Sequence, residues 1–219
     1  MIGKQPYLFT IVVSCFLCVS VASATPKAVP KPGSFCPGPE VRLVVAEELS
    51  ASLDLTLHSM AALVAKDKST AFNELNSAGT LLYLAASRGA AARSNLLIDA
   101  VIQAKHGEDF SDMLDWFPLL QTSLQTIPED PAVTKARNLI FGAEDIMQYQ
   151  KDVDPITPLK EARHMLACDA LDLPLHEAKK EQHLLMTKLA QGTLKNDDYS
   201  LLLDPVRSAL AYSMSGNIE

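Results

Sequence analysis

Three pairs of residues mark helix starts in the second half of the chain, and they constrain the fold more than any other feature. Each pair places an Asp or Thr directly before a proline: Asp130-Pro131, Thr157-Pro158 and Asp204-Pro205. A proline fits the first turn of a helix because its missing N–H would have no acceptor there, and the preceding side chain can accept hydrogen bonds from free N–H groups. The pairs predict helices over 131–151, 158–172 and 205–214.

The remainder of the chain after Glu40 also has a helical pattern. Ala, Leu, Lys, Glu and Gln dominate it, and alternating runs of β-branched residues are missing. Apolar residues recur close to the helical period, which predicts further helices over 40–65, 70–87, 90–105, 174–191 and 197–203. We therefore predict an all-α fold, an irregular antiparallel bundle of about six to eight helices joined by short turns.

Residues 1–24 have the composition of a secretory signal peptide. Lys4 is the only charged residue before an uncharged stretch, and Ala22 and Ala24 provide the small residues that a signal peptidase reads. The apolar part is shorter than the roughly 20 residues that a membrane-spanning helix needs. We predict cleavage after Ala24 and a periplasmic or secreted mature protein, with no stable membrane anchor after cleavage.

Residues 25–39 form a Pro-rich segment that precedes the helices. Its five prolines and two glycines exclude a helix and favour an extended path. Cys36 lies in this segment, and Cys168 is the only other cysteine after residue 24. Two cysteines in an exported chain predict a disulfide. We expect residues 25–39 to form an extended strap, fixed by Cys36–Cys168 to a single helical-bundle domain of residues 40–219.

Charge and motifs exclude several classes of protein. The formal net charge is −7 and the pI is near 5.2, so a nucleic-acid partner is not expected, because phosphate contacts need a basic surface. The sequence has no G-x-S-x-G nucleophile turn, no phosphate-binding G-x-x-x-x-G-K-[ST] loop and no G-x-G-x-x-G. We predict a non-enzymatic protein without a cofactor, although enzymatic activity stays open.

One cluster of histidines suggests an alternative, a small-ligand or metal site. His176 and His183 are seven residues apart on one predicted helix, about 10 Å along its axis, which is too far to share one ion directly. His164 could contribute from a neighbouring helix, with Arg163 beside it. This alternative therefore uses His164, His176, His183 and Arg163.

A second cluster suggests a surface for a partner. Trp116, Phe117, Leu119 and Leu120 surround Pro118, and exposed apolar residues of this kind are typical of contact surfaces. The acidic balance would favour a basic partner through long-range attraction. We predict an exported, non-enzymatic helical binding or interaction protein whose partner is another protein. Examples of this class are envelope stress factors, inhibitor or immunity proteins and secretion accessories.

Overall fold

The computed structural model describes residues 30–106, 110–149 and 153–215, and these residues form an all-α structure. Its elements are α1 (Pro39–Val64), α2 (Lys68–Ala86), α3 (Ala90–Gln103), α4 (Ser111–Leu114), α5 (Phe117–Gln125), α6 (Pro131–Tyr149), α7 (Ile156–Met165), α8 (Asp169–Gln191), the short 3-10 helix η1 (Asn196–Asp198) and α9 (Tyr199–Met214). Ser34 and Cys168 form an isolated β-bridge. The predicted all-α helical bundle is confirmed.

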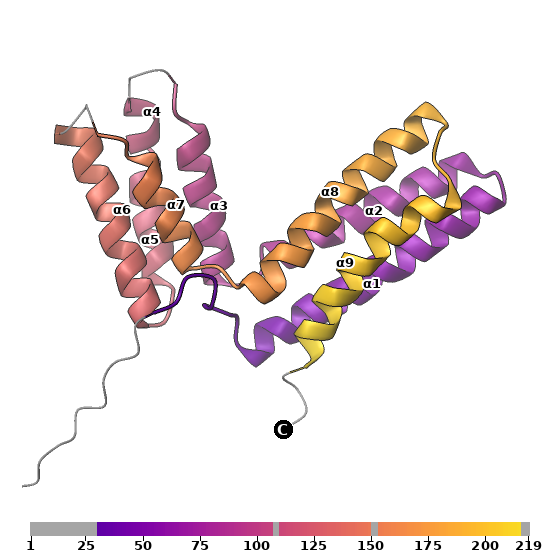
Figure 1. Cartoon of the computed structure of the whole chain (residues 1–219), viewed down its shortest axis with the longest axis horizontal. Coiled ribbons are helices and arrows are strands. Elements are labelled where there is room, and N and C mark those ends of the chain that lie inside the picture. Colours follow the sequence, from indigo (N-terminus) through magenta and orange to yellow (C-terminus); the bar gives the residue numbers. More distant parts are fainter. Residues whose placement is uncertain (1–29, 107–109, 150–152, 216–219) are drawn as a thin grey trace, which may run out of the picture.

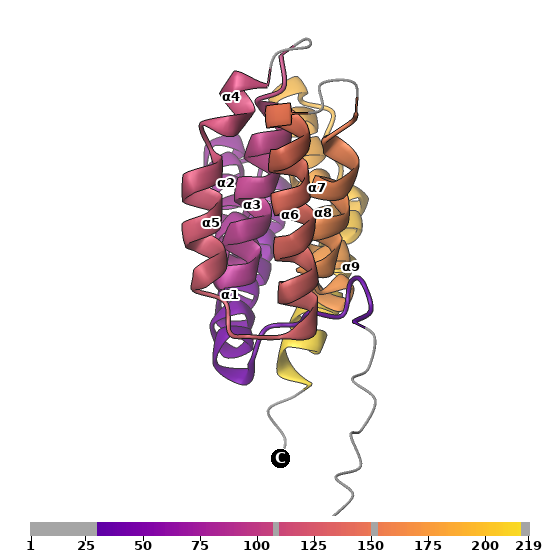
Figure 2. The ribbon, with the colours of Figure 1, turned by 90° about the vertical axis from the view of Figure 1, so that its left-hand side faces the viewer.

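The helices pack into two groups that diverge from a common base like the arms of a V (Figure 1). In the α1–α2–α8–α9 group, the core consists of residues such as Leu49, Leu75, Leu82, Leu175 and Leu202. In the α3–α7 group, it consists of residues such as Ile98, Met113, Phe117, Ile140 and Leu159. Figure 2 shows the α3–α7 group in front, with its longer helices running side by side. Whether residues 40–219 act as one domain stays a prediction.

Small polar residues let α1 and α2 approach closely. Ser52 and Ser59 lie on one face of α1 and are fully buried. The Ser52 hydroxyl donates to the Ala78 carbonyl at 3.0 Å, and the Ser59 hydroxyl donates to the Ala71 carbonyl at 2.7 Å. Both buried hydroxyls therefore have the partners that burial requires. The Tyr199 hydroxyl lies 2.8 Å from Ser59 Oγ and ties α9 to the same face.

Gly79 in α2 has a packing reason for lacking a side chain. A Cβ atom at this position would lie 2.4 Å from the side-chain nitrogen of Gln182 on α8. That nitrogen donates to the Leu75 carbonyl at 3.0 Å, across the interface of α2 and α8. The glycine costs helix propensity, but it makes room for a buried hydrogen bond between two helices.

One of the three predicted helix starts is confirmed. Asp130 precedes α6, and its Oδ1 accepts the N–H of Ala132 at 2.7 Å. The predicted start at Thr157-Pro158 is displaced, because α7 begins at Ile156 and Asp154 caps it instead. The Asp154 carboxylate accepts the N–H of Ile156 at 3.1 Å and that of Thr157 at 3.3 Å.

Two prolines expected to open helices lie inside them. The predicted start at Asp204-Pro205 is wrong, because α9 runs without a break from Tyr199 through Pro205. Likewise Pro174 lies within α8, which starts at Asp169 rather than at the proline. The apolar face of α9 is buried on both sides of Pro205, and this packing holds the helix together despite the missing N–H.

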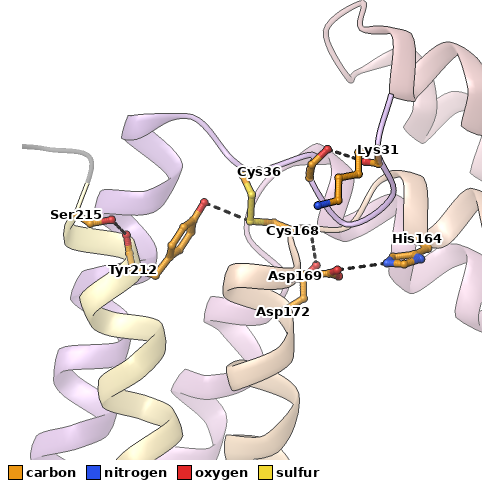
Figure 3. The surroundings of a disulfide bond; sticks show 9 residues. Lys31, Cys36, His164, Cys168, Asp169, Asp172, Tyr212 and Ser215 are labelled. Carbon is orange, nitrogen blue, oxygen red and sulfur yellow. Dashed lines mark hydrogen bonds and ion pairs between the residues drawn. A yellow bond between two sulfur atoms is a disulfide. The ribbon is translucent and has the colours of Figure 1, made fainter. Parts of the chain in front are cut away.

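The described part of the strap, residues 30–38, lies across the base of the V. Its backbone pairs with the end of α7 and the segment after it: the Gly33 N–H donates to the His164 carbonyl at 2.8 Å, and the Phe35 N–H donates to the Ala167 carbonyl at 3.0 Å. The predicted Cys36–Cys168 disulfide is confirmed. Figure 3 shows it beside Tyr212 of α9, whose hydroxyl lies 3.4 Å from the Cys168 sulfur. The strap is therefore held by backbone bonds and by a covalent bond.

The predicted signal peptide, with Ala22 and Ala24, lies outside the described residues, as do residues 25–29 of the predicted strap. Within the described ranges, no helix is long and apolar enough to span a membrane.

Candidate functional site

The histidines and the arginine of the predicted ligand site do not meet. His164, at the end of α7, faces Asp169, with 3.4 Å between its Nε2 and the carboxylate (Figure 3). Arg163 is bound elsewhere, through an ion pair of 2.7 Å with Asp99 of α3. His176 and His183 are exposed on α8. Across residues 30–106, 110–149 and 153–215, no three or more His, Cys, Asp or Glu side chains gather as metal ligands. The geometry therefore gives the metal alternative no support.

The predicted contact surface is divided between the core and the surface. Phe117 and Leu120 are buried in the core of the α3–α7 group, so their assignment to a contact surface is wrong. They lie on the face of α5 that packs inward, whereas Trp116 and Leu119 are 40% and 53% exposed. Leu119 lines a shallow groove of about 470 Å³ between α3 and α5, opposite Leu96.

A cavity lies at the base of the V, where the two helix groups meet. Its volume is about 280 Å³. Both groups contribute to its wall. The strap and α1 contribute Phe35, Cys36, Pro37, Gly38 and Val41, and the stretch from the end of α2 into α3 contributes Ala85, Ala86, Arg88, Gly89, Ala90, Ala91, Ala92 and Asn95. The loop before α6 contributes Ile127 and Pro128, and the stretch from the end of α7 into α8 contributes Leu166, Cys168, Leu171, Asp172 and Leu175. The lining is mostly apolar, and the disulfide is part of it.

Asn95 is the most unusual polar residue of this wall. It is only 8% exposed, and its Oδ1 has no hydrogen-bond partner in the described part of the chain. Ala91 and Ala92 precede it by four and three residues, so all three share one face of α3, and all three line the cavity. A buried amide without a partner costs stability unless something else satisfies it.

Arg88 forms a charged part of the same wall. Its guanidinium binds the buried Glu48 carboxylate of α1, which reaches it through one oxygen, Oε1. The other Glu48 oxygen is buried without a partner. The hydrogen bond and the charge of Glu48 raise the pKa of Arg88. The guanidinium is thus charged and already engaged, and its side chain is 43% exposed.

Asp172 of α8 adds a carboxyl group to the cavity wall. Burial raises the pKa of Asp172, and the hydrogen bond that its Oδ2 accepts from the Cys168 N–H, at 2.8 Å, partly opposes this effect. Further along α8, burial lowers the pKa of Lys179, and the charge of Asp172 partly restores it. The cavity wall therefore holds one cation and one acid in an apolar surrounding.

Sequence reasoning missed this site. Asp172 of α8 lies far along the chain from Arg88, in the turn before α3, and from Asn95 on α3, so no spacing pattern connects it with them. The one local signal is the run Gly89-Ala90-Ala91-Ala92, where a helix begins with side chains too small to fill the space beside them. A run of this kind at a helix start indicates a void or a close contact, and here it borders a void.

The arrangement is suited to holding a small molecule. A mostly apolar, concave wall with a few polar groups is the usual form of a small-molecule site.

A comparison of the chain with protein-family models, with curated proteins and with solved structures finds no match in any of the three.

Proposed function

We propose that the mature chain is an exported, non-enzymatic binding protein whose binding site is the cavity at the base of the V. The observation that supports it is a cavity of about 280 Å³ between the two helix groups, with the buried, unpaired amide oxygen of Asn95 in its wall. Export is supported by Lys4, the uncharged stretch after it and Ala22-Ser23-Ala24, and by a disulfide of the kind that persists in oxidising compartments.

The size of the cavity defines what it can hold. A dry protein cavity of about 150 Å³ accommodates benzene. The cavity described above is close to twice that size, so a two-ring aromatic molecule such as naphthalene is a suitable first probe. Because both helix groups supply the wall, a bound molecule would contact both and favour their observed arrangement.

The test is the binding of 2-naphthol to the mature protein, followed by its fluorescence and by the amide NMR signals of Ala90, Ala91 and Ala92. We expect saturable binding that shifts these signals. Ala91→Leu should weaken it at least tenfold by filling the cavity, and Ala86→Leu serves as a second filling variant in case the first does not fold. The matched control is Ala190→Leu, at an exposed position of α8 outside the cavity wall.

Equal affinity in the wild type and in both folded filling variants would refute the proposal, as would the absence of saturable binding.

A second candidate function is the binding of a partner protein, favoured by the groove between α3 and α5. Leu96 and Leu119 border it and are 50% and 53% exposed. A groove between two helices accepts the apolar face of a third helix, and the net charge of −7 favours a basic one. The partner would therefore present a basic amphipathic helix.

The partner hypothesis is tested with Leu96→Asp and Leu119→Asp in a pull-down from envelope extract. Each substitution should remove the same captured protein, whereas Leu201→Asp, at a leucine of α9 that is 54% exposed, should retain it. Loss in all three variants, or in none, would contradict docking in this groove.

A further inference from the structure

The cavity at the base of the V contains a polar group that an apolar ligand would leave unsatisfied. Asn95 is the only uncharged polar side chain among the residues that line it, apart from the cysteines of the disulfide. Its Oδ1 is buried without a partner, although buried amides normally have one. An amide can present either its oxygen or its nitrogen after rotation about χ2, so the position offers an acceptor or a donor.

The charges around the cavity argue against a charged ligand. Arg88 and Asp172 line it with opposite charges, and Arg88 is already paired with Glu48. An anion would meet the carboxyl group of Asp172, and a cation would meet the guanidinium of Arg88. In an apolar wall, either would also lose part of its hydration.

A hydroxyl group meets these conditions. It donates to the oxygen of an amide and accepts from the nitrogen, so it satisfies Asn95 in either orientation. It is uncharged, so it conflicts with neither Arg88 nor Asp172. Its apolar carrier would lie against the small residues Ala86, Ala91 and Ala92, which leave the space open.

Building on the proposed binding function, we propose that the ligand of this cavity is a neutral, apolar hydroxyl compound whose hydroxyl group hydrogen-bonds to Asn95. An aromatic or aliphatic alcohol or phenol of about ten carbon atoms has the required size, judged against the benzene that a cavity of about 150 Å³ holds. Asn95 then recognises the hydroxyl, and the alanines of α3 select for size.

The experiment compares 2-naphthol with naphthalene, which has the same rings without the hydroxyl. In the wild type, 2-naphthol should bind at least tenfold more tightly than naphthalene. In Asn95→Leu, which replaces the amide by an apolar side chain of similar size, this preference should vanish or reverse, because the buried hydroxyl then lacks a partner. The Ala190→Leu variant should retain the wild-type ratio.

A structural role for Asn95 would give a different result. Without ligand, Asn95→Leu should unfold at the same or a higher temperature than the wild type, because it removes a buried group that has no partner. A substitution that lowered the unfolding temperature would assign Asn95 to the fold and overturn the proposal.

The failures of the two proposals are distinguishable. If naphthalene and 2-naphthol bind equally well to the wild type, and Ala91→Leu weakens both, then the cavity binds small molecules but the hydroxyl inference is wrong. The same conclusion follows if the ratio of the two affinities is the same in the wild type and in Asn95→Leu. If neither probe binds to the wild type, then the binding function itself is refuted. Tighter binding of 2-naphthoate than of 2-naphthol would also overturn the inference, because it would show that the cavity prefers an anion.

Discussion

Removing the Cys36–Cys168 disulfide should destabilise the protein severely. The bond closes a loop of 132 residues, which holds α1 to α7 between its ends. The chain-entropy relation for a loop of this length gives about 17 cal/mol/K, or about 5 kcal/mol at 25 °C. This value is a ceiling, because residual structure in the unfolded chain reduces it. It is a large fraction of the 5–15 kcal/mol by which domains are typically stable.

The suitable variant is Cys36→Ser combined with Cys168→Ala. Cys36 is exposed, so a hydroxyl group is tolerated there, whereas Cys168 is only 3% exposed and calls for an apolar replacement. The backbone hydrogen bonds of Gly33 and Phe35 to the end of α7 and the segment after it remain, so the folded state should keep its strap. We therefore expect the loss to arise mainly in the unfolded chain, at about 3–5 kcal/mol.

The assay is urea unfolding of both proteins, followed by circular dichroism and by the fluorescence of Trp116. Circular dichroism reports all the helices, whereas Trp116 reports the α3–α7 group alone. The two transitions should coincide in the wild type and separate in the variant, because the bond couples the groups. A loss below about 1 kcal/mol would refute the entropic reasoning. Two titratable thiols in the unreduced, denatured mature protein would refute the bond itself.

Three further perturbations test the packing. Gly79→Ala should cost about 1–2 kcal/mol in chemical denaturation, because its Cβ displaces the Gln182 side chain from its buried hydrogen bond; in a Gln182→Ala background the same change should be neutral or stabilising. Ser59→Ala should cost about 1–3 kcal/mol, because it removes the buried hydrogen bond to the Ala71 carbonyl and leaves the Tyr199 hydroxyl without this partner; in a double-mutant cycle, Tyr199→Phe should cost less in the Ser59→Ala background than alone. Burial raises the pKa of Asp172, so between the ordinary Asp pKa and the raised one the folded state binds more protons than the unfolded state, and the stability that this group contributes falls as pH rises through that window. Asp172→Asn should remove that fall. Unfolding curves of both proteins from pH 4 to 7 that shift in parallel would contradict this expectation.

Local sequence signals were sufficient for the helices but not for all their ends. Asp130 before Pro131 correctly marks the start of α6, because both the cap and the proline act within one turn. Pro205 looks the same locally, yet α9 continues through it. The difference lies in tertiary packing, since Leu203 and Val206 are buried on either side of Pro205. A capping residue before a proline favours a helix start at that position, but the burial of the neighbouring apolar residues decides whether the helix starts there.

The division into two cores could not be predicted from the sequence either. Helical periodicity shows which face of a helix is buried, but not which helix covers it. The helices α2 and α3 are separated by only three residues, yet their buried apolar residues belong to different cores. Cys36 and Cys168 were predictable as a pair because only two cysteines follow residue 24.

The position of the cavity follows from the way the chain connects the two groups. In the described chain, the groups are joined by the strap before α1, by the turn from α2 to α3, and by the segment from α7 to α8. The turn from α2 to α3 contains Gly89 at φ +89°, a conformation that favours glycine, and the small residues Ala90, Ala91 and Ala92 follow it. Small residues at converging turns cannot fill the space between two diverging helix groups. The disulfide and the backbone hydrogen bonds of the strap hold the chain together at this place, so a void can persist there without collapse.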